Sequence, residues 1–512
     1  MILFVEPTSK NTDLYVPAYP LPLMELASLA KWAMPQTRIE VISMSMDYGL
    51  PLSKAGKEQI HIEFMKDLAE MRPRGVGISC TAIAQAEETI ELCELIKSHD
   101  PETLVFLGGY FPTIYYEEIF SRTRAVDIIV RGEGEISTLR IIDEIEKGRN
   151  PFDSGIPNLV WKKDGDLCLT KTESPFDLKK KAILDLSLLR VPKKYDVLPY
   201  AFSRGCPYRC DFCMEGLIRP VRREVPEDIV RRDLDNLSRQ SKAQTLLVSD
   251  ALFTGFDKFP LLQSLGMEIN FETRCDVADP SAISRIADVC GIIAIGLESA
   301  SYHSLRRMNK VKDRSHFEKY ISNTLAIFRE ASTYEIPVMV FMIAGYPGDT
   351  EEDLRQSLSF AGKLSEMAGP GGHIFKIGEC RVYPKTKLHG VASSMDGVVF
   401  DDQGVFGDNI VRQPSENVDF EKVLSYMKQV FRLSNSTAKL EKALSKVMPL
   451  FRVPALSLND PLIPDKCYRG EGREILNVQG DSLSLLRNLM PDLRGKYKEM
   501  MSEVRQTREL RA

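Results

Sequence analysis

Three cysteines lie close together in the stretch SRGCPYRCDFCMEG, residues 203–216. They are Cys206, Cys210 and Cys213, which gives the spacing CxxxCxxC. Thiolate ligands select zinc, copper(I) or iron–sulfur clusters. A structural zinc site usually takes four ligands from two separated cysteine pairs, and the chain has no second pair. The other cysteines of the 512-residue chain stand singly, at Cys80, Cys93, Cys168, Cys275, Cys290, Cys380 and Cys467.

A four-iron cluster held by three thiolates fits this motif best. Such clusters normally take four cysteines, so three cysteines leave one iron open to bind a small molecule. A disulfide framework is the competing interpretation. A long chain with ten cysteines, whose start MILFVEPTSK predicts a strand and not a signal peptide, argues against that framework. Free thiols and an oxygen-sensitive cluster also predict a reducing, cytoplasmic location.

The cysteine motif resembles the signature of the radical SAM superfamily, because Phe212 precedes the last cysteine and Arg204 and Gly205 precede the first. The resemblance implies that the open iron chelates the amino and carboxylate groups of S-adenosylmethionine (SAM). One electron from the cluster then cleaves SAM to methionine and a 5′-deoxyadenosyl radical. An electron donor such as flavodoxin or ferredoxin is implied as well.

Composition excludes several classes of protein. The chain is 43% hydrophobic and 27% charged, with a net charge of −5, so no basic surface predicts a nucleic-acid partner. No apolar run approaches the roughly 18 residues that a membrane-spanning helix needs. We therefore expect neither nucleic-acid binding nor an integral membrane protein.

Residues 1–150 alternate short apolar runs, such as GVGISC and TLVFLGG, with segments of helical period. This alternation predicts an α/β fold with a Rossmann-like, doubly wound parallel sheet. Loops at the carboxyl ends of such strands form a binding crevice, and glycines there let a backbone approach a ligand closely. Ordinary strand-end turns are an equally good explanation. The candidate crevice residues are Ser79, Thr81, Gly108, Gly109, Gly132 and Glu133.

The same region resembles the cobalamin-binding domain that precedes the barrel in many radical SAM enzymes. The similarity lies in FLGGYFPTIYYEEI and VDIIVRGEGE. Domains that ligate cobalt through histidine carry a DxHxxG motif, which this chain lacks. The resemblance therefore implies cobalamin without a histidine ligand, or a domain that has lost the cofactor.

The rest of the chain divides into three regions. Residues 151–198 are expected to form a connector with a hairpin around the DG turn of WKKDGDLCLT. Residues 199–395 contain six strand–helix units, which predict a partial TIM-type barrel with its chemistry at the carboxyl ends of the strands. Residues 396–512 are expected to form a mostly helical C-terminal domain. By analogy with similar enzymes, that domain would shape the substrate pocket.

Polar residues at the barrel strand ends are candidates for SAM contacts. Asp250 ends the second strand, Arg274 the third and Glu298 the fourth. A guanidinium suits a carboxylate, and IGLESAS and AGYPGDTEED resemble motifs of related radical SAM proteins. Salt bridges across the barrel mouth are the alternative for each charged residue. The predicted SAM-binding residues are Phe212, Asp250, Arg274, Glu298, Gly345, Pro347 and Gly348.

These features favour a radical SAM enzyme that methylates an unactivated carbon through methylcobalamin. The substrate class stays open between small molecules, lipids and peptides. The main alternative is a radical cyclisation, rearrangement or C–C bond formation without methyl transfer. A non-catalytic cobalamin or cluster sensor is the third interpretation. It is disfavoured because the three cysteines and the polar strand ends are all present.

Overall fold

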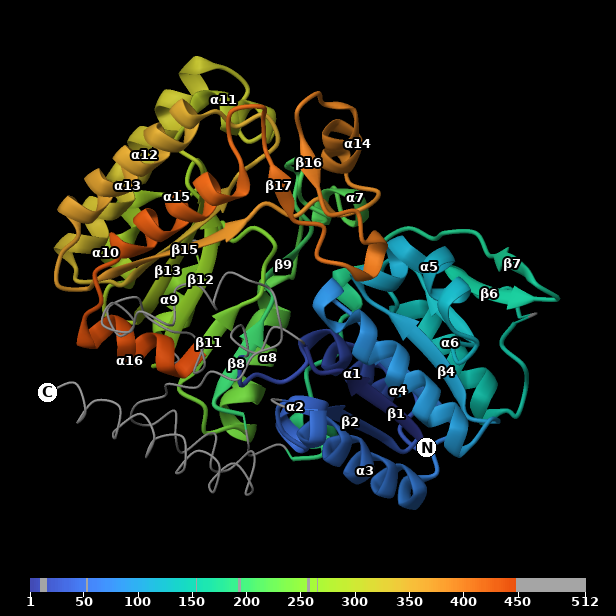
Figure 1. Ribbon diagram of the computed structural model, residues 1–512. Coiled ribbons are helices and arrows are strands. Elements are labelled where there is room, and N and C mark those ends of the chain that lie inside the picture. Colours follow the sequence, from blue (N-terminus) through green and yellow to red (C-terminus); the bar gives the residue numbers. More distant parts are fainter. Residues whose placement is uncertain are drawn as a thin grey trace, which may run out of the picture.

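The computed structural model describes residues 1–9, 16–51, 54–152, 154–191, 195–255, 258–264 and 266–447. The predicted C-terminal domain therefore lies partly outside the described residues, from residue 448 onward. The described chain forms two α/β modules that lie side by side (Figure 1). No helix in these ranges has the length and apolar character to cross a membrane.

The first module is built on a seven-stranded sheet with the order β2-β1-β3-β4-β5-β6-β7. Five of its strands are parallel and mostly buried, as expected when helices cover both faces. These are β1 (Ile2–Glu6), β2 (Ile39–Ser43), β3 (Gly75–Ser79), β4 (Leu104–Gly108) and β5 (Ile128–Val130). The order 2-1-3-4-5 reverses direction between β1 and β3, and ligands of doubly wound sheets bind at such a switch point.

Helices cover the two faces of this sheet separately. α1 (Leu21–Ala33) and α6 (Glu135–Glu146) pack on the face that carries Ile2 and Phe4. The opposite face, which carries Leu3 and Val5, is covered by α3 (Lys54–Met71), α4 (Ala86–His99) and α5 (Tyr110–Arg122). The sheet is therefore doubly wound, as the alternating sequence predicts.

The hairpin expected at the DG turn consists of β6 (Leu159–Lys163) and β7 (Asp166–Leu169). It is not a separate connector element. β6 pairs antiparallel with β5, so the hairpin forms the outer edge of the first sheet. Backbone pairing to β5 satisfies the edge of the parallel sheet, a contact that the local sequence pattern does not reveal.

The second module contains six parallel strands in the order β8-β11-β12-β13-β14-β15. β8 and β15 do not pair with each other, so the sheet is the open, partial barrel that the six strand–helix units predict. The strands are β8 (Val197–Tyr200), β11 (Thr245–Val248), β12 (Glu268–Arg274), β13 (Cys290–Glu298), β14 (Val338–Ala344) and β15 (His373–Glu379). The outer face is covered by α8 (Glu227–Gln240), α10 (Ile283–Ile286), α12 (Arg314–Thr333) and α13 (Glu351–Met367).

The described part of the C-terminal region is helical with one short ribbon, formed by β16 (Val399–Phe400) and β17 (Val411–Gln413). α15 (Phe420–Arg432) packs beside α13, whereas α16 (Ala438–Val447) packs against the inner face of the barrel sheet (Figure 1). Leu440 and Leu444 of α16 contact Ile292, near the start of its strand. α16 therefore covers the amino-terminal end of the barrel, opposite the end where chemistry is expected.

Asp233 of α8 is a fully buried carboxylate that ties the segment after the hairpin to the barrel. It accepts hydrogen bonds from Lys181 Nζ at 2.5 Å, Leu184 N at 2.9 Å and the Tyr200 hydroxyl at 3.0 Å. Lys181 is itself buried. Removing one partner of a buried pair leaves the other charge without compensation.

We therefore expect Asp233→Ala to lower the free energy of unfolding by about 3–5 kcal/mol. The matched control is Arg231→Ala in the same helix, which breaks an exposed ion pair with Glu227 and should cost less than about 1 kcal/mol. Urea unfolding monitored by circular dichroism measures both. Equal stability of the two variants would contradict the assignment.

Candidate cofactor site

The three motif cysteines lie in a loop that a short ribbon closes. β9 (Ser203–Arg204) pairs antiparallel with β10 (Arg223–Glu224), and the loop runs between them at the carboxyl end of β8. Gly205 has φ +86°, and a Cβ there would lie 2.3 Å from the carbonyl oxygen of Val221. Only glycine fits this turn, which carries the chain into Cys206.

The loop is held by its own backbone. Cys206 N donates to Arg219 O at 3.0 Å, and Cys213 N donates to Cys210 O at 3.0 Å. The short helix α7 (Glu215–Ile218) follows at once. The loop is therefore ordered by contacts between its two ends.

The donor set fits a multi-iron cluster and not a single metal ion. A tetrahedral zinc ion with Zn–S bonds of about 2.3 Å brings its sulfur ligands to within about 3.8 Å of one another. Among the described residues, the three cysteine sulfurs do not all lie within 4.8 Å of one another. A four-iron cluster spreads its thiolates over separate irons. Cys206 and Cys210 are half-buried residues and Cys213 is an exposed one.

Arg274, predicted to bind the carboxylate of SAM, makes four hydrogen bonds within the protein. Its Nε and Nη2 donate to the two carboxylate oxygens of Asp276, each at 2.9 Å. Nη2 also donates to the carbonyl of Lys310 at 2.9 Å, and Nη1 donates to the sulfur of Cys210 at 3.3 Å. The structure thus places Arg274 against the cysteine loop, in the salt bridge that was the alternative interpretation.

Asp250 is also committed to the base of the loop. It accepts a hydrogen bond from Phe202 N at 2.6 Å and one from the Ser203 hydroxyl at 2.5 Å. Burial raises the pKa of Asp250 to about 6, although both hydrogen bonds oppose the increase. These contacts position the strand that leads into Cys206.

Glu298 lies on the same side of the barrel mouth as Arg274. It adopts φ +62°, a conformation that is costly for a side-chain-bearing residue and typical of functional sites. Its carboxylate accepts from the buried ammonium of Lys310 at 2.8 Å. Because the Lys310 carbonyl binds Arg274, a continuous polar chain links Glu298 to Cys210.

The predicted turn of Gly345, Pro347 and Gly348 follows β14 and packs against the C-terminal region. A Cβ on Gly345 would lie 2.9 Å from Val423 of α15, and Gly348 N donates to Pro414 O at 2.7 Å. Both glycines have positive φ. Phe212 is partly buried against the barrel core. None of these contacts tests a role in SAM binding.

Glu272 is a residue that the sequence analysis missed. It stands in the central strand β12, two positions before Arg274 and therefore on the same, inner face. Water reaches its side chain, yet burial raises its pKa to about 7, and the Glu298 carboxylate adds to the increase. Glu272 therefore points into the interior of the open barrel, which we call the barrel chamber. Glu268, Asn270 and Arg274 share this face of the strand, and that row of polar residues was the available signal.

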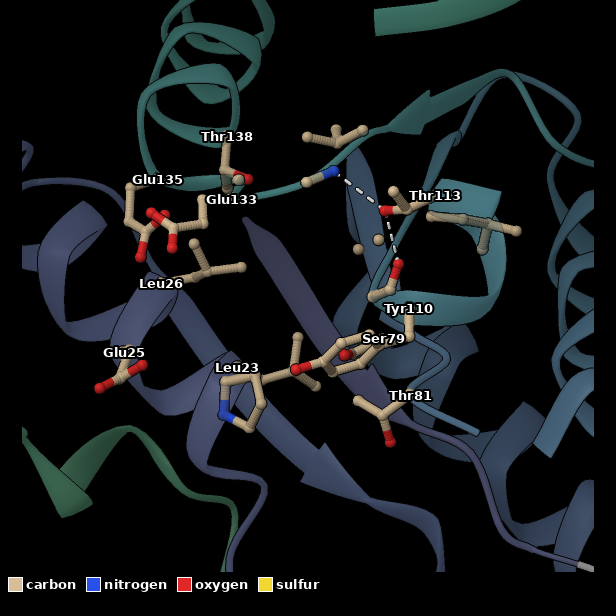
Figure 2. Close-up of a pocket in the computed structure, with 18 of the residues that line it drawn as sticks. Leu23, Glu25, Leu26, Ser79, Thr81, Tyr110, Thr113, Glu133, Glu135 and Thr138 are labelled. Atoms are coloured by element: carbon tan, nitrogen blue, oxygen red, sulfur yellow. Dashed lines mark hydrogen bonds between the residues drawn. The ribbon is translucent and has the colours of Figure 1, made fainter. Parts of the chain in front are cut away.

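A cavity lies at the carboxyl edge of the first sheet, and all six predicted crevice residues line it. Figure 2 shows Ser79, Thr81 and Tyr110 on one side and Glu133 on the other. Thr113 joins two of the glycine loops, because its hydroxyl donates to Gly109 O at 2.7 Å and accepts from Gly132 N at 2.9 Å (Figure 2). The cavity therefore sits at the switch point between β1 and β3.

The glycines of this cavity serve different purposes. A Cβ on Gly108 or Gly132 would meet nothing within 4 Å, so both face open space. Gly109 has φ +104°, and a Cβ there would lie 2.4 Å from the carbonyl oxygen of Cys80. Gly109 is therefore required by the backbone of the loop, and a substitution there would disrupt the loop before it filled the cavity.

The opposite wall of the cavity belongs to the cysteine loop. Arg204, Ile218 and Arg219 line it together with Tyr110 of α5. The Tyr110 hydroxyl donates to Glu215, and the Arg219 guanidinium lies 4.9 Å from the centroid of the Tyr110 ring. The cavity is thus closed by contacts between the first module and the helix that follows Cys213.

Glu133 takes part in this junction. Its carboxylate pairs with Arg204 at 3.7 Å and with Arg223, and it accepts from Phe176 N at 2.8 Å. The predicted cobalamin contact is therefore an ion-pairing residue between the two modules. The sequence gives no sign that Glu133 pairs with Arg204 and Arg223, which lie 71 and 90 positions away in the chain.

The cavity fits a large, flat ligand only in part. The cavity has a volume of about 160 Å³ and is open to solvent at its mouth. A corrin would lie partly in that mouth, against the open faces of Gly108 and Gly132. None of the six histidines of the chain lines the cavity, in agreement with the missing DxHxxG motif. The residues present thus fit a corrin without a histidine ligand to cobalt.

A separate group of metal-type ligands, His61, Glu88 and Glu91, lies on α3 and α4. The ammonium of Lys57 lies 2.9 Å from the Glu88 carboxylate and 2.5 Å from that of Glu91. These carboxylates already pair with a cation. The group is therefore a structural ion-pair cluster.

Comparison with known proteins agrees with this geometry. Residues 34–141 match the B12 binding domain and residues 200–361 match the radical SAM superfamily. The anaerobic magnesium-protoporphyrin IX monomethyl ester cyclase of Rubrivivax gelatinosus is 25% identical over 317 residues, which are 57% of this chain and 55% of that protein. An uncharacterized methyltransferase of Pyrococcus horikoshii is 25% identical over 319 residues, 59% of this chain and 67% of that protein.

Among solved structures, the radical SAM methyltransferase TsrM from Kitasatospora setae, with tryptophan substrate and a SAM analogue bound, has the same fold. The TM-score is 0.64 at 14% identity, covering 85% of this chain and 89% of that one. The chain spans little more than half of the cyclase relative, so the likeness concerns the two shared modules. Residues 34–141 therefore belong to a B12-binding domain and residues 200–361 to a radical SAM domain, whose cofactors are cobalamin, a four-iron cluster and SAM.

Proposed function

We propose that the protein is a methyltransferase that places a methyl group on an unactivated carbon. One observation carries the proposal: the cavity at the edge of the first sheet is walled by Arg204, Ile218 and Arg219 of the cysteine loop. A ligand in that cavity lies against the mouth of the barrel. Methyl transfer between cobalamin and a substrate in the barrel requires this proximity.

Each cofactor has a set of residues to hold it. Cys206, Cys210 and Cys213 would bind the cluster, and the strand-end glycines Gly108 and Gly132 would face cobalamin. When bound, these cofactors supply electron transfer to SAM and a methyl carrier. Contacts of Phe212, Asp250, Arg274, Glu298, Gly345, Pro347 and Gly348 with SAM remain predictions, as do the cytoplasmic location and a flavodoxin or ferredoxin donor.

The protein's own side chains fix the distance between the two sites. Tyr110 reaches from α5 to Glu215, and Arg219 lies over the Tyr110 ring. Asp250 holds the strand before Cys206 from the other side. These contacts hold the loop between the barrel and the first module. They would thereby orient the two cofactors relative to each other.

The barrel chamber favours a substrate with a polar group. Glu272 faces the chamber, and the Lys376 ammonium lies 5.6 Å from the centroid of the Phe341 ring on the neighbouring strand. A purely hydrocarbon substrate would remove these charged groups from water and offer them no hydrogen bond, which costs free energy. Small molecules, peptides and lipids with a polar head meet the requirement.

Ring formation without methyl transfer is the second candidate. Its support is the cyclase of Rubrivivax gelatinosus, a relative that is 25% identical over 317 residues. The two candidates differ in the fate of the SAM methyl group. Only a methyltransferase moves it from SAM to the bound cobalamin.

The first prediction from this proposal concerns that transfer. Protein loaded with iron, sulfide and cobalamin under anaerobic conditions, and reduced in the presence of SAM with a deuterated methyl group, should pass the label to cobalamin. Mass spectrometry of the extracted cofactor measures it. Formation of 5′-deoxyadenosine with no labelled cobalamin would favour the ring-forming candidate.

A second prediction tests the cluster ligands. Cys210→Ala removes one of three thiolates, so the variant should lose most of its iron, measured by iron analysis and the cluster's visible absorbance. Cys168→Ala is the control, because Cys168 lies in β7 on the outer edge of the first sheet. Full iron content in Cys210→Ala would show that the cluster lies elsewhere.

A third prediction tests the cavity. Gly108→Leu places a side chain in open space and should weaken cobalamin binding by about tenfold or more, equivalent to about 1.4 kcal/mol. Gly362→Leu is the matched control, because a Cβ there also meets nothing within 4 Å but lies on α13 of the barrel. Unchanged cobalamin affinity in Gly108→Leu, titrated by absorbance, would place the cofactor outside this cavity.

A further inference from the structure

The inference concerns Arg274, whose side chain contacts the cysteine loop at two residues. Its Nη1 donates to the sulfur of Cys210 at 3.3 Å. Its guanidinium carbon also lies 3.8 Å from the centroid of the Tyr208 ring, within the CxxxC segment. Arg274 is buried, with 7% of its surface exposed, so both contacts are made away from bulk water.

The position of this guanidinium is fixed from behind. Asp276 binds it through both oxygens, and Asp276 also lies 2.9 Å from Nε2 of His316 on α12. The Lys310 carbonyl takes a further donor of the arginine. A guanidinium held in this way presents one N–H at a defined angle to one sulfur.

We propose that Arg274 is a positioning residue that sets the reduction potential of the cluster through its hydrogen bond to the Cys210 sulfur. The inference rests on the assignment of Cys210 as a cluster ligand. Hydrogen bonds to cysteine sulfurs and nearby charge are levers that tune iron–sulfur potentials. Reduction adds one negative charge to the cluster, and a donor with positive charge beside a ligand sulfur stabilises the reduced form.

The same geometry separates this role from binding of SAM. A bidentate grip on the SAM carboxylate would require Arg274 to give up contacts with Asp276 or Lys310, because these contacts occupy Nε and both N–H groups of Nη2. A buried guanidinium that leaves a bidentate carboxylate loses a charge-assisted pair. The contacts in the structure therefore favour an effect on the sulfur.

The experiment is a redox titration of the iron-loaded protein without SAM and without cobalamin, followed by electron paramagnetic resonance. Arg274→Gln should lower the ratio of reduced to oxidised cluster at a given potential by about tenfold, which is about 59 mV for a one-electron couple. Arg274→Lys keeps the charge but loses the fixed fork, so its ratio should fall between those of Arg274→Gln and the unmodified protein. Arg381→Gln is the control: this arginine after β15 also pairs with two carboxylates, Glu379 and Asp408.

An unchanged potential in Arg274→Gln at full iron content overturns the proposal. If Arg274→Gln holds no iron, the potential of Arg274→Lys is measured in its place. A potential of Arg274→Lys equal to that of the unmodified protein overturns the proposal. Loss of iron from both variants does so too, because Arg274 then holds the loop together. Weaker SAM binding with an unchanged potential would assign Arg274 to SAM. The titration uses no methyl transfer, so failure of the methyltransferase proposal leaves its result readable.

Discussion

One buried arginine, Arg204, joins the two modules. It stands directly before the cysteine loop and pairs with Glu25 of α1 at 2.7 Å and with Glu135 of α6 at 2.5 Å. A buried guanidinium costs several kcal/mol unless its geometry and hydrogen bonds are good. The helices of the first sheet must therefore sit against the base of the loop.

The two carboxylates that pair with Arg204, those of Glu25 and Glu135, have pKa values shifted in opposite directions. Burial has the largest single effect on Glu25 and raises its pKa, but Arg204, Lys181 and Arg219 together outweigh burial and lower that pKa. For Glu135 burial prevails and raises the pKa, and one carboxylate oxygen has no hydrogen-bond partner among the described residues. The junction thus carries more acid than one arginine neutralises, and Lys181 and Arg223 supply further positive charge around it. Its net effect is to fix geometry more than to add stability.

This junction has a direct functional consequence. Because Arg204 belongs both to the ribbon that closes the cysteine loop and to the wall of the cavity, the two cofactor sites share a residue. Neither site can shift without disturbing a buried charge. The hydrogen bond from Tyr110 of α5 to Glu215 of α7 is a second contact between the first module and the cysteine loop. The cysteine loop and the cavity of the first sheet are therefore joined by a buried ion-pair network.

Much of the architecture follows from the sequence alone. The apolar strand periodicity predicts both parallel sheets, and the CxxxCxxC spacing predicts a cluster ligand set because three neighbouring thiols satisfy few other metals. The strand-end positions of Gly108 and Gly132 predict the cavity, since carboxyl ends of parallel strands share one edge. These are local signals, and each is contained in a short stretch of chain.

Only the tertiary structure decides what the charged residues do. Arg274 and Asp250 look alike in sequence as strand-end groups for SAM, yet one binds Asp276 and Cys210, and the other binds Phe202 and Ser203. Glu133 pairs with arginines of the other module, and Gly109 is required by the Cys80 carbonyl. In most of these cases the partner lies far away in the chain, at a distance that no periodicity encodes. A charged side chain takes the nearest compensating group in space, and folding alone determines which group that is.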